Sequence, residues 1–161
     1  MDRLIVLWGF LLAISLPAGE GKPNILFIMA DDLGWMDLAV QGNKLVETPN
    51  LDRLAKQGMR FTDAYAAAPV CSPTRCAVLT GQAPARIGLT THLPGMFFPK
   101  DNRPQPAILT KQLNTDYVTI AERMREAGYK SAFLGKWHIA SSVGKGGRVA
   151  PELSPTGQGF D

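Results

Sequence analysis

One uninterrupted apolar run constrains the fold of this chain more than any other feature. The run extends from Ile25 to Met29, with Pro23-Asn24 before it and Asp31-Asp32 after it. A strand that is hydrophobic at every position is buried on both faces, which is typical of parallel or mixed sheets. The run therefore predicts an interior strand of an α/β protein.

Helix and strand signals alternate along the rest of the chain. Thr48-Pro49 supplies an N-cap and a first helical residue, and Thr119 with Glu122 forms a capping box. Glycines mark the helix ends. The expected helices cover residues 48–58, 75–80 and 119–128, a loop is expected at 69–75, and further short strands at 60–65 and 131–134. Because strands and helices alternate, the sequence predicts the α/β class.

The first residues have the pattern of a secretion signal. Met1-Asp2-Arg3 precedes an apolar run from Leu4 to Leu16, which Pro17 ends. This run is too short to span a bilayer, which takes ~20 residues, but it suits the apolar region of a signal peptide. We expect a signal peptide at residues 1–19, no membrane span after cleavage, and export to the periplasm, cell surface, extracellular medium or lysosome. A buried helix or an uncleaved anchor is the alternative.

Composition fits an ordinary globular protein. Hydrophobic residues make up 45% of the 161 residues and charged residues 19%, which argues against disorder. The formal net charge of +3 is too mild and too scattered to predict a nucleic-acid surface. No nucleic-acid partner is therefore expected.

The two cysteines are poor candidates for a disulfide or a zinc site. Cys71 and Cys76 are too close in sequence to constrain much of the chain, and their spacing is not Cys-x-x-Cys. A zinc site would need more ligands than these cysteines with His92 and His138, the only histidines. A redox pair is an alternative that the spacing disfavours.

Two segments of the chain show no regular pattern. Residues 82–116 are interrupted by five prolines, and long irregular segments in compact domains are often functional. Residues 141–161 are rich in Gly, Ser and Pro and contain no closing element, so three expected strands would leave bare sheet edges. We expect the chain to be a fragment that is inactive and poorly folded on its own.

The strongest chemical signal is Cys71-Ser-Pro-Thr-Arg75, followed by Leu79-Thr-Gly81. Pro73 suits the first position of a helix, which would place Cys71 just ahead of a helix N-terminus. Backbone N–H groups there attract anions, and Arg75 adds a fixed charge. An isolated cysteine at such a place would be interpreted as a buried structural residue. The pattern Cys-x-Pro-x-Arg with Leu-Thr-Gly, however, resembles the signature of the sulfatase family, in which a formylglycine-generating enzyme converts the cysteine to formylglycine.

Two further segments resemble the same family. Asp31-Asp32 resembles the acidic pair that helps to bind calcium, and oxygen ligands at the carboxyl end of a strand suit this ion. Without the signature, the pair would be interpreted as a solvated turn. Gly135-Lys136-Trp137-His138 resembles the segment with a sulfate-binding lysine and a histidine that contacts the formylglycine. If the segment is extended, Lys136 and His138 share one side and Trp137 lies on the other.

The resemblance covers residues 23–161 and implies a fold and a reaction. The implied fold is an alkaline-phosphatase-like α/β/α sandwich around a mixed, largely parallel sheet, with residues 20–161 as the N-terminal part of the catalytic domain. The implied catalytic residues are Cys71, Arg75, Lys136 and His138, and one Ca²⁺ would be held by Asp31, Asp32 and the modified Cys71. A hydroxyl of the hydrated formylglycine would attack a sulfate ester on a small molecule or a glycan.

Alternatives of two kinds remain beside this interpretation. A phosphonate or phosphate ester hydrolase of the same superfamily would use the same modified cysteine on a similar tetrahedral anion. A non-catalytic exported binding protein would keep the motif with Cys71 as an unmodified thiol. His92 lies in a segment that resembles the family's stretch after the signature helix, but it receives no role.

Overall fold

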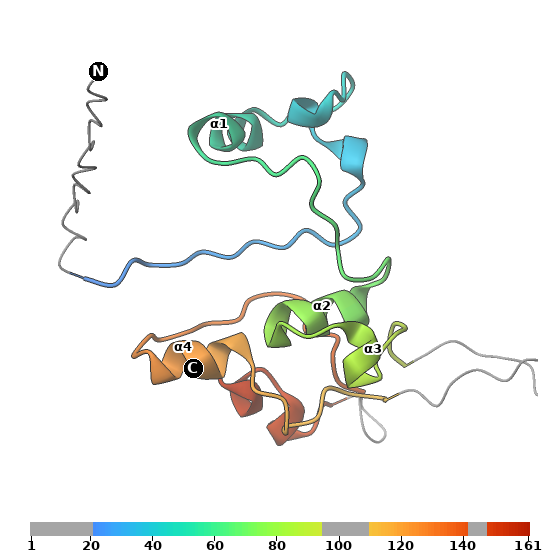
Figure 1. The fold of residues 1–161 in the computed structure, drawn as a ribbon, viewed down its shortest axis with the longest axis vertical. Coiled ribbons are helices and arrows are strands. Elements are labelled where there is room, and N and C mark those ends of the chain that lie inside the picture. The colour runs from blue at the N-terminus through green and yellow to red at the C-terminus, as the bar shows by residue number, and fades with distance from the viewer. Residues whose placement is uncertain (1–20, 95–109, 142–147) are drawn as a thin grey trace, which may run out of the picture. The chain divides into compact units, whose positions relative to one another are not determined.

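The structure is a computed structural model that describes residues 21–94, 110–141 and 148–161. The chain forms two compact units, Met1–Leu33 and Gly34–Asp161. Figure 1 shows the helices of the second unit and, from the first, the described residues 21–33. The signal peptide predicted at residues 1–19 lies outside the described residues, so it stays a prediction.

The described part of the first unit, residues 21–33, contains neither a helix nor a strand. Leu26 is 84% exposed and Ile28 is 77% exposed, so the strand predicted at Ile25–Met29 is not formed in this structure and most of its apolar side chains are uncovered. A strand that is hydrophobic on both faces is buried only between neighbouring strands and covering side chains. No described segment forms a β-ladder with these residues.

The other two predicted strands are not formed either. Residues 60–65 and 131–134 have no regular structure, and an isolated antiparallel bridge joins Gln112 and Ala140. Phe61 is 68% exposed and Leu134 is 92% exposed. Of the α/β pattern that the sequence predicts, the described residues show the helices and not the sheet.

The second unit contains four α-helices in its described residues. They are α1 (Pro49–Gln57), α2 (Cys71–Thr80), α3 (Pro84–Ile87) and α4 (Ile120–Glu126). Short 3-10 helices cover Trp35–Asp37, Ala39–Gln41, Pro151–Leu153 and Thr156–Gln158. The helices predicted at 48–58 and 119–128 are confirmed within the usual uncertainty of helix ends.

Local signals account for where α1 and α4 begin. Pro49 is the first residue of α1, as its fixed φ favours, and the Thr48 hydroxyl donates a hydrogen bond to Asp52 Oδ1 at 2.9 Å. At α4 the capping box is complete. Glu122 N donates to Thr119 Oγ1 at 3.3 Å, and Thr119 N donates to Glu122 Oε2 at 2.7 Å.

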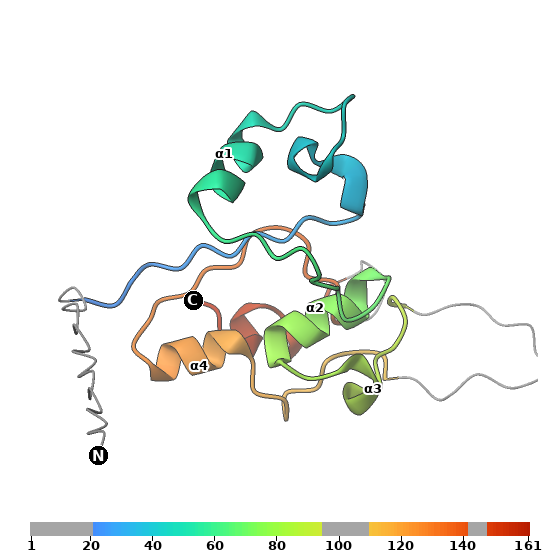
Figure 2. The same ribbon diagram turned by 45° about the horizontal axis from the view of Figure 1, so that its top comes forward.

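The hydrophobic core of the second unit is built around α2 and the segments that follow it. Its buried members are Cys76, Leu79, Ile87, Leu89, Leu93, Leu113 and Ile139. Leu113 N donates to Ile139 O at 2.7 Å, which joins two segments that are far apart in sequence. Figures 1 and 2 both show α2 beside α4, and the two helices are in contact.

The end of the chain packs against α4 and the segment that follows it. A Cβ on Gly159, whose φ is +99°, would lie 2.5 Å from Glu122 Cγ, so this position requires glycine. Phe160 contacts Phe133 and Trp137 edge to face, with ring centroids 5.4 Å and 6.0 Å away. The last residues therefore hold the segment that contains Lys136 and His138 against the core.

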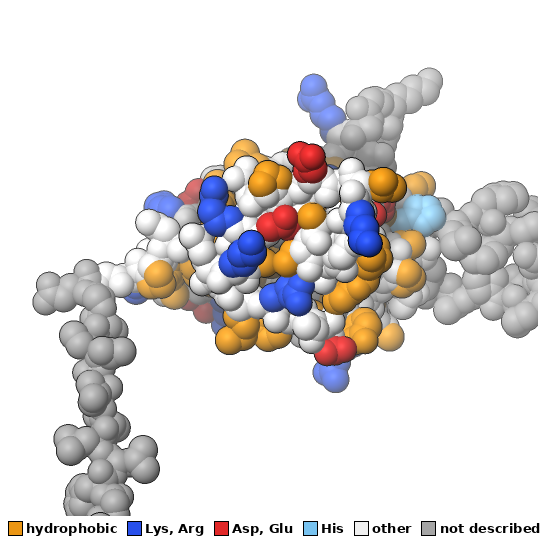
Figure 3. All heavy atoms as spheres, turned by 90° about the horizontal axis from the view of Figure 1, so that it is seen from above, with side chains coloured by type: hydrophobic (Ala, Val, Ile, Leu, Met, Phe, Trp, Pro, Cys, Tyr) orange, Lys and Arg blue, Asp and Glu red, His pale blue; other side chains and the backbone are white. Residues whose placement is uncertain are grey.

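One face of the molecule shows charges of both signs. On the face drawn in Figure 3, basic and acidic side chains are interspersed with hydrophobic ones. In the ranges that the structure describes, no helix has the length and apolar character needed to cross a membrane.

Candidate active site

The start of α2 carries the cysteine of the signature. The helix begins at Cys71 itself, with Val70 as the N-cap in an extended conformation. The prediction of a loop to Arg75, with Cys71 ahead of the helix, is therefore wrong by four residues. Pro73 is the third helical residue, not the first, and is tolerated because the first-turn N–H groups have no intrahelical acceptor.

Cys71 and Cys76 lie in different environments although they share α2. Both are free thiols, Cys71 is half-buried, and Cys76 is completely buried. Burial raises the pKa of the Cys76 thiol to about 12, which keeps it protonated and unreactive. Of the two, only Cys71 is partly accessible to solvent, and the two cysteines do not form a disulfide in this structure.

Arg75 joins α2 to the segment that resembles the family's lysine–histidine motif. Its side chain is buried, with 7% of the residue exposed, and Nη1 donates a hydrogen bond to the backbone oxygen of Lys136. A charged hydrogen bond of this kind fixes the position of both groups. The side chain of Lys136 itself is exposed.

His138 is held from the other side by the segment after α3. Its Nε2 lies 2.7 Å from the backbone oxygen of Leu93, and Leu93 N donates to Ser72 Oγ at 3.0 Å. His138 has a φ of +52°, so the predicted fully extended alternation ends there. Trp137 forms a separate contact: its Nε1 donates to Leu153 O at 2.8 Å.

The predicted calcium ligands Asp31 and Asp32 belong to the first unit, and both are exposed. Asp32 has a φ of +58°, and with His138 it is one of only two non-glycine residues with positive φ in the described ranges. Such conformations often mark functional positions. Carboxylate oxygens suit Ca²⁺, but the ion takes about six to eight oxygens. No group of three His, Cys, Asp or Glu side chains gathers in the described part.

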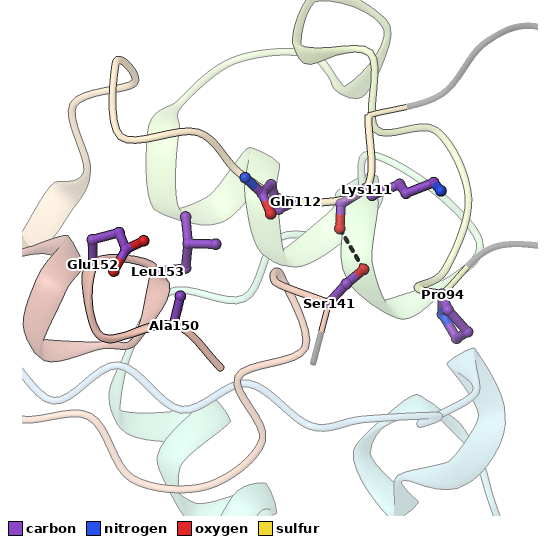
Figure 4. Close-up of a pocket in the computed structure, with 7 residues that line it drawn as sticks. All are labelled: Pro94, Lys111, Gln112, Ser141, Ala150, Glu152 and Leu153. Carbon is purple, nitrogen blue, oxygen red and sulfur yellow. Dashed lines mark hydrogen bonds between the residues drawn. The ribbon is translucent and has the colours of Figure 1, made fainter. Parts of the chain in front are cut away.

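A hollow of about 580 Å³ lies beside the segments that hold His138. Figure 4 shows its lining, which includes none of the predicted site residues: Pro94, Lys111, Gln112, Ser141, Ala150, Glu152 and Leu153. The Ser141 hydroxyl donates to Lys111 O at 2.7 Å across one wall. His92, half-buried next to Leu93, takes part in no hydrogen bond that defines the site.

The sequence did not predict a role for two residues of this arrangement. Ser72 occupies an open position in the Cys-x-Pro-x-Arg pattern, and Leu93 acts through its backbone rather than its side chain. The sequence drew attention to the segment of residues 88–94 but not to these atoms. The structure brings together Arg75, the Lys136 backbone and His138 around the start of α2, and it leaves Asp31-Asp32 in a separate unit.

At the start of α2, the structure thus holds a half-buried cysteine, a buried arginine bonded to the Lys136 backbone, and a histidine linked through Leu93 to Ser72. The sulfatase family model matches residues 23–161, and the chain belongs to the sulfatase family. It is 40% identical to the N-acetylgalactosamine-6-sulfatase of Canis lupus familiaris over 163 residues, which cover 96% of this chain and 28% of that protein. It is 42% identical to the arylsulfatase A of Bos taurus, over 90% of this chain and 26% of that protein.

A solved structure shares the fold as well. It is described as the crystal structure of Ps i-CgsB in complex with k-i-k-neocarrahexaose, with a TM-score of 0.70 and 38% identity. The match covers 88% of this chain and 27% of that one. The chain thus spans about a quarter of the length of the proteins it matches.

Proposed function

We propose that this chain carries the nucleophile of a sulfuric ester hydrolase, and that the nucleophile is a formylglycine made from Cys71 by a formylglycine-generating enzyme. The observation that carries the proposal is the start of α2. Cys71 is its accessible first residue, and Arg75 on the same helix is anchored to the backbone of Lys136. Membership of the sulfatase family supports the reaction class.

The proposed reaction uses both hydroxyl groups of the hydrated aldehyde at residue 71. One hydroxyl loses its proton to a base as its oxygen attacks the sulfur of the sulfate ester, and the S–O bond to the alcohol breaks as that alcohol takes up a proton. The second hydroxyl then loses its proton, the C–O bond to the bound sulfate breaks, and the aldehyde forms again. A serine at this position could not release sulfate by this second step, because it has only one oxygen on its Cβ.

The surrounding groups suit an anion with charge on three oxygens. The first-turn N–H groups of α2, the Arg75 guanidinium and the exposed Lys136 ammonium supply positive potential at the site. Stabilising charge as it develops on the sulfuryl oxygens is the largest contribution expected of such groups. His138 Nδ1 is proposed to accept a hydrogen bond from a hydroxyl at residue 71.

Asp31 and Asp32 are proposed to hold one Ca²⁺ together with the modified residue 71. Their carboxylates have the hard oxygen chemistry that the ion prefers. When bound, the ion neutralises negative charge on the sulfuryl oxygens. Further oxygen ligands are needed beyond these three residues, and none is assigned among the described residues.

Substrate class, fold and destination are proposed on the same basis. Two of the matched proteins have names that refer to sugars, an N-acetylgalactosamine-6-sulfatase and a complex with k-i-k-neocarrahexaose, which favours a sulfated glycan as the first substrate to test. The apolar run at Ile25–Met29 is proposed to be an interior strand of an α/β/α sandwich once neighbouring strands pair with it. The leader at residues 1–19 is proposed to direct export.

A peptide mass on the natural or full-length protein that contains this chain tests the proposal most directly. The tryptic peptide from Phe61 to Arg75 contains Cys71 and no other cysteine. We expect the mass of an aldehyde at residue 71, together with hydrolysis of an aryl sulfate that is faster than hydrolysis of the matching aryl phosphonate. Cys71→Ala is the control and should abolish turnover. An intact thiol in protein from a host that makes formylglycine would favour a binding protein instead.

A further inference from the structure

Ser72 is completely buried although it lies next to the half-buried Cys71. Its Oγ accepts a hydrogen bond from Leu93 N at 3.0 Å. The backbone oxygen of the same residue, Leu93, lies 2.7 Å from His138 Nε2. One backbone residue therefore connects the second position of α2 to the histidine of the site.

The contact with Leu93 decides which ring nitrogen of His138 carries the hydrogen. A carbonyl oxygen can only accept, so Nε2 has to be the protonated nitrogen. In the neutral ring, Nδ1 then carries the lone pair and can accept a hydrogen bond. Nδ1 is buried, and no described group forms a hydrogen bond with it.

We propose that Ser72 is a positioning residue. By holding Leu93, it keeps His138 in the Nε2–H tautomer, with Nδ1 presented as an acceptor to a hydroxyl at residue 71. The contact between Nδ1 and a hydroxyl at residue 71 rests on the proposed function, whereas the tautomer of His138 does not depend on it. The Cys-x-Pro-x-Arg signature does not specify the residue at position 72, so this role is assigned to the serine of this chain and not to the signature.

The physical basis is the burial of the groups involved. Removing the Ser72 hydroxyl leaves Leu93 N–H buried without an acceptor, which is more costly than losing an exposed hydrogen bond. The backbone of Leu93 then shifts as its N–H turns toward another acceptor, which weakens the contact of its carbonyl oxygen with Nε2. His138 has a φ of +52°, so its backbone is held by its surroundings and is sensitive to such a shift.

A double-mutant cycle on turnover separates this role from a general effect on folding. In the full-length enzyme, we expect Ser72→Ala to lower kcat on the order of 10-fold with little change in KM and unchanged formylglycine at residue 71. In a His138→Gln background, the same substitution should have no further effect, because Ser72 acts through that ring. Equal kcat losses in both backgrounds would overturn the proposal.

Ring ¹⁵N chemical shifts of His138 test the tautomer without reference to activity. Measured at about pH 8, where an ordinary histidine is neutral, they should show Nε2–H in the wild type and a mixture with Nδ1–H in Ser72→Ala. Ser72→Thr, which keeps the hydroxyl, should restore the wild-type shifts. Ser141→Ala is the matched control, since it removes a serine hydroxyl that donates to Lys111 O and does not contact Leu93.

The outcomes distinguish the two proposals. Wild-type shifts in a folded Ser72→Ala protein would contradict the positioning role even if the enzyme is a sulfatase. A wild-type protein with the Nε2–H tautomer but an unmodified Cys71 would contradict the proposed function and leave the positioning of His138 by Ser72 in place.

Discussion

Helices α1 and α2 begin with comparable local signals but lie in different surroundings. Each contains a proline within its first three residues and an arginine as its fifth residue, and a glycine follows each one. Yet α1 buries none of its residues, and α2 buries five: Ser72, Pro73, Arg75, Cys76 and Leu79. Local sequence is therefore sufficient to start and stop a helix, whereas burial depends on what other segments pack against it.

The contrast is clearest in the apolar side chains. In α1, Leu54 is 61% exposed, and Leu51 is 46% exposed. In α2, Leu79 is 8% exposed and belongs to the core. The stronger amphipathic pattern belongs to the helix that is less buried, so periodicity alone does not show where the core lies.

The arginines at the fifth position of each helix give the largest expected difference. Arg75→Ala removes the buried charge and its contact with Lys136 O, and should lower kcat/KM on the order of 100- to 1,000-fold. Arg53→Ala at the matching, exposed position of α1 should leave kcat/KM within about twofold of wild type, as expected of a surface substitution. Steady-state hydrolysis of an aryl sulfate measures both. Equal losses of kcat/KM in the two variants would contradict the functional difference between α1 and α2.

The leucines test the same contrast through stability. Leu79→Ala should lower the free energy of unfolding by about 3 kcal/mol, because it leaves a cavity in the core. Leu54→Ala should cost less than about 1 kcal/mol, since this side chain is mostly exposed. Urea unfolding followed by circular dichroism measures the difference. A cost for Leu54→Ala as large as that for Leu79→Ala would show that another segment covers α1.

The buried thiol of α2 predicts a dependence of stability on pH. The pKa of Cys76 is raised from 9.0 to about 12, so the unfolded chain ionises first and the stability is lost as pH rises above 9. Between pH 9 and 10.5 this contributes roughly 2 kcal/mol of destabilisation. Cys76→Ala should lack this part of the pH dependence. Urea unfolding at several pH values compares the two, and identical slopes would contradict the burial of this thiol.

The smallest expected effect is at the end of the chain. Asp161 accepts hydrogen bonds from Ser131 N and Lys130 Nζ, and these contacts lower the pKa of its carboxyl group. A carboxyl pKa that is lower in the folded state stabilises the fold at pH values above the pKa of the unfolded chain. This stabilisation is lost as the pH falls through the pKa of the folded state. Asp161→Asn should therefore lower the melting temperature slightly at neutral pH and not in acid. A difference that persists in acid would assign the effect to the side-chain shape.

Some of this arrangement was predictable from sequence for physical reasons. The capping box at Thr119 and Glu122 and the glycine stop at Gly81 act within a few residues, and both are present in the structure. The start of α2 was misplaced because Pro73 is compatible with any position of the first turn. The first turn of α2 is also held by a side-chain contact that the sequence pattern does not show: Thr74 Oγ1 donates to Ala68 O at 2.7 Å.

The sequence by itself determined the family, the helix boundaries that depend on caps, and the residue types of the candidate site. Only the tertiary structure decided which of them meet. Arg75 reaches Lys136 O across 61 residues of sequence, and His138 reaches Leu93 O across 45. The same holds for the exposure of residues 25–28, part of a run whose pattern predicts burial. Contacts between distant segments depend on packing and loop closure, which a local pattern does not specify.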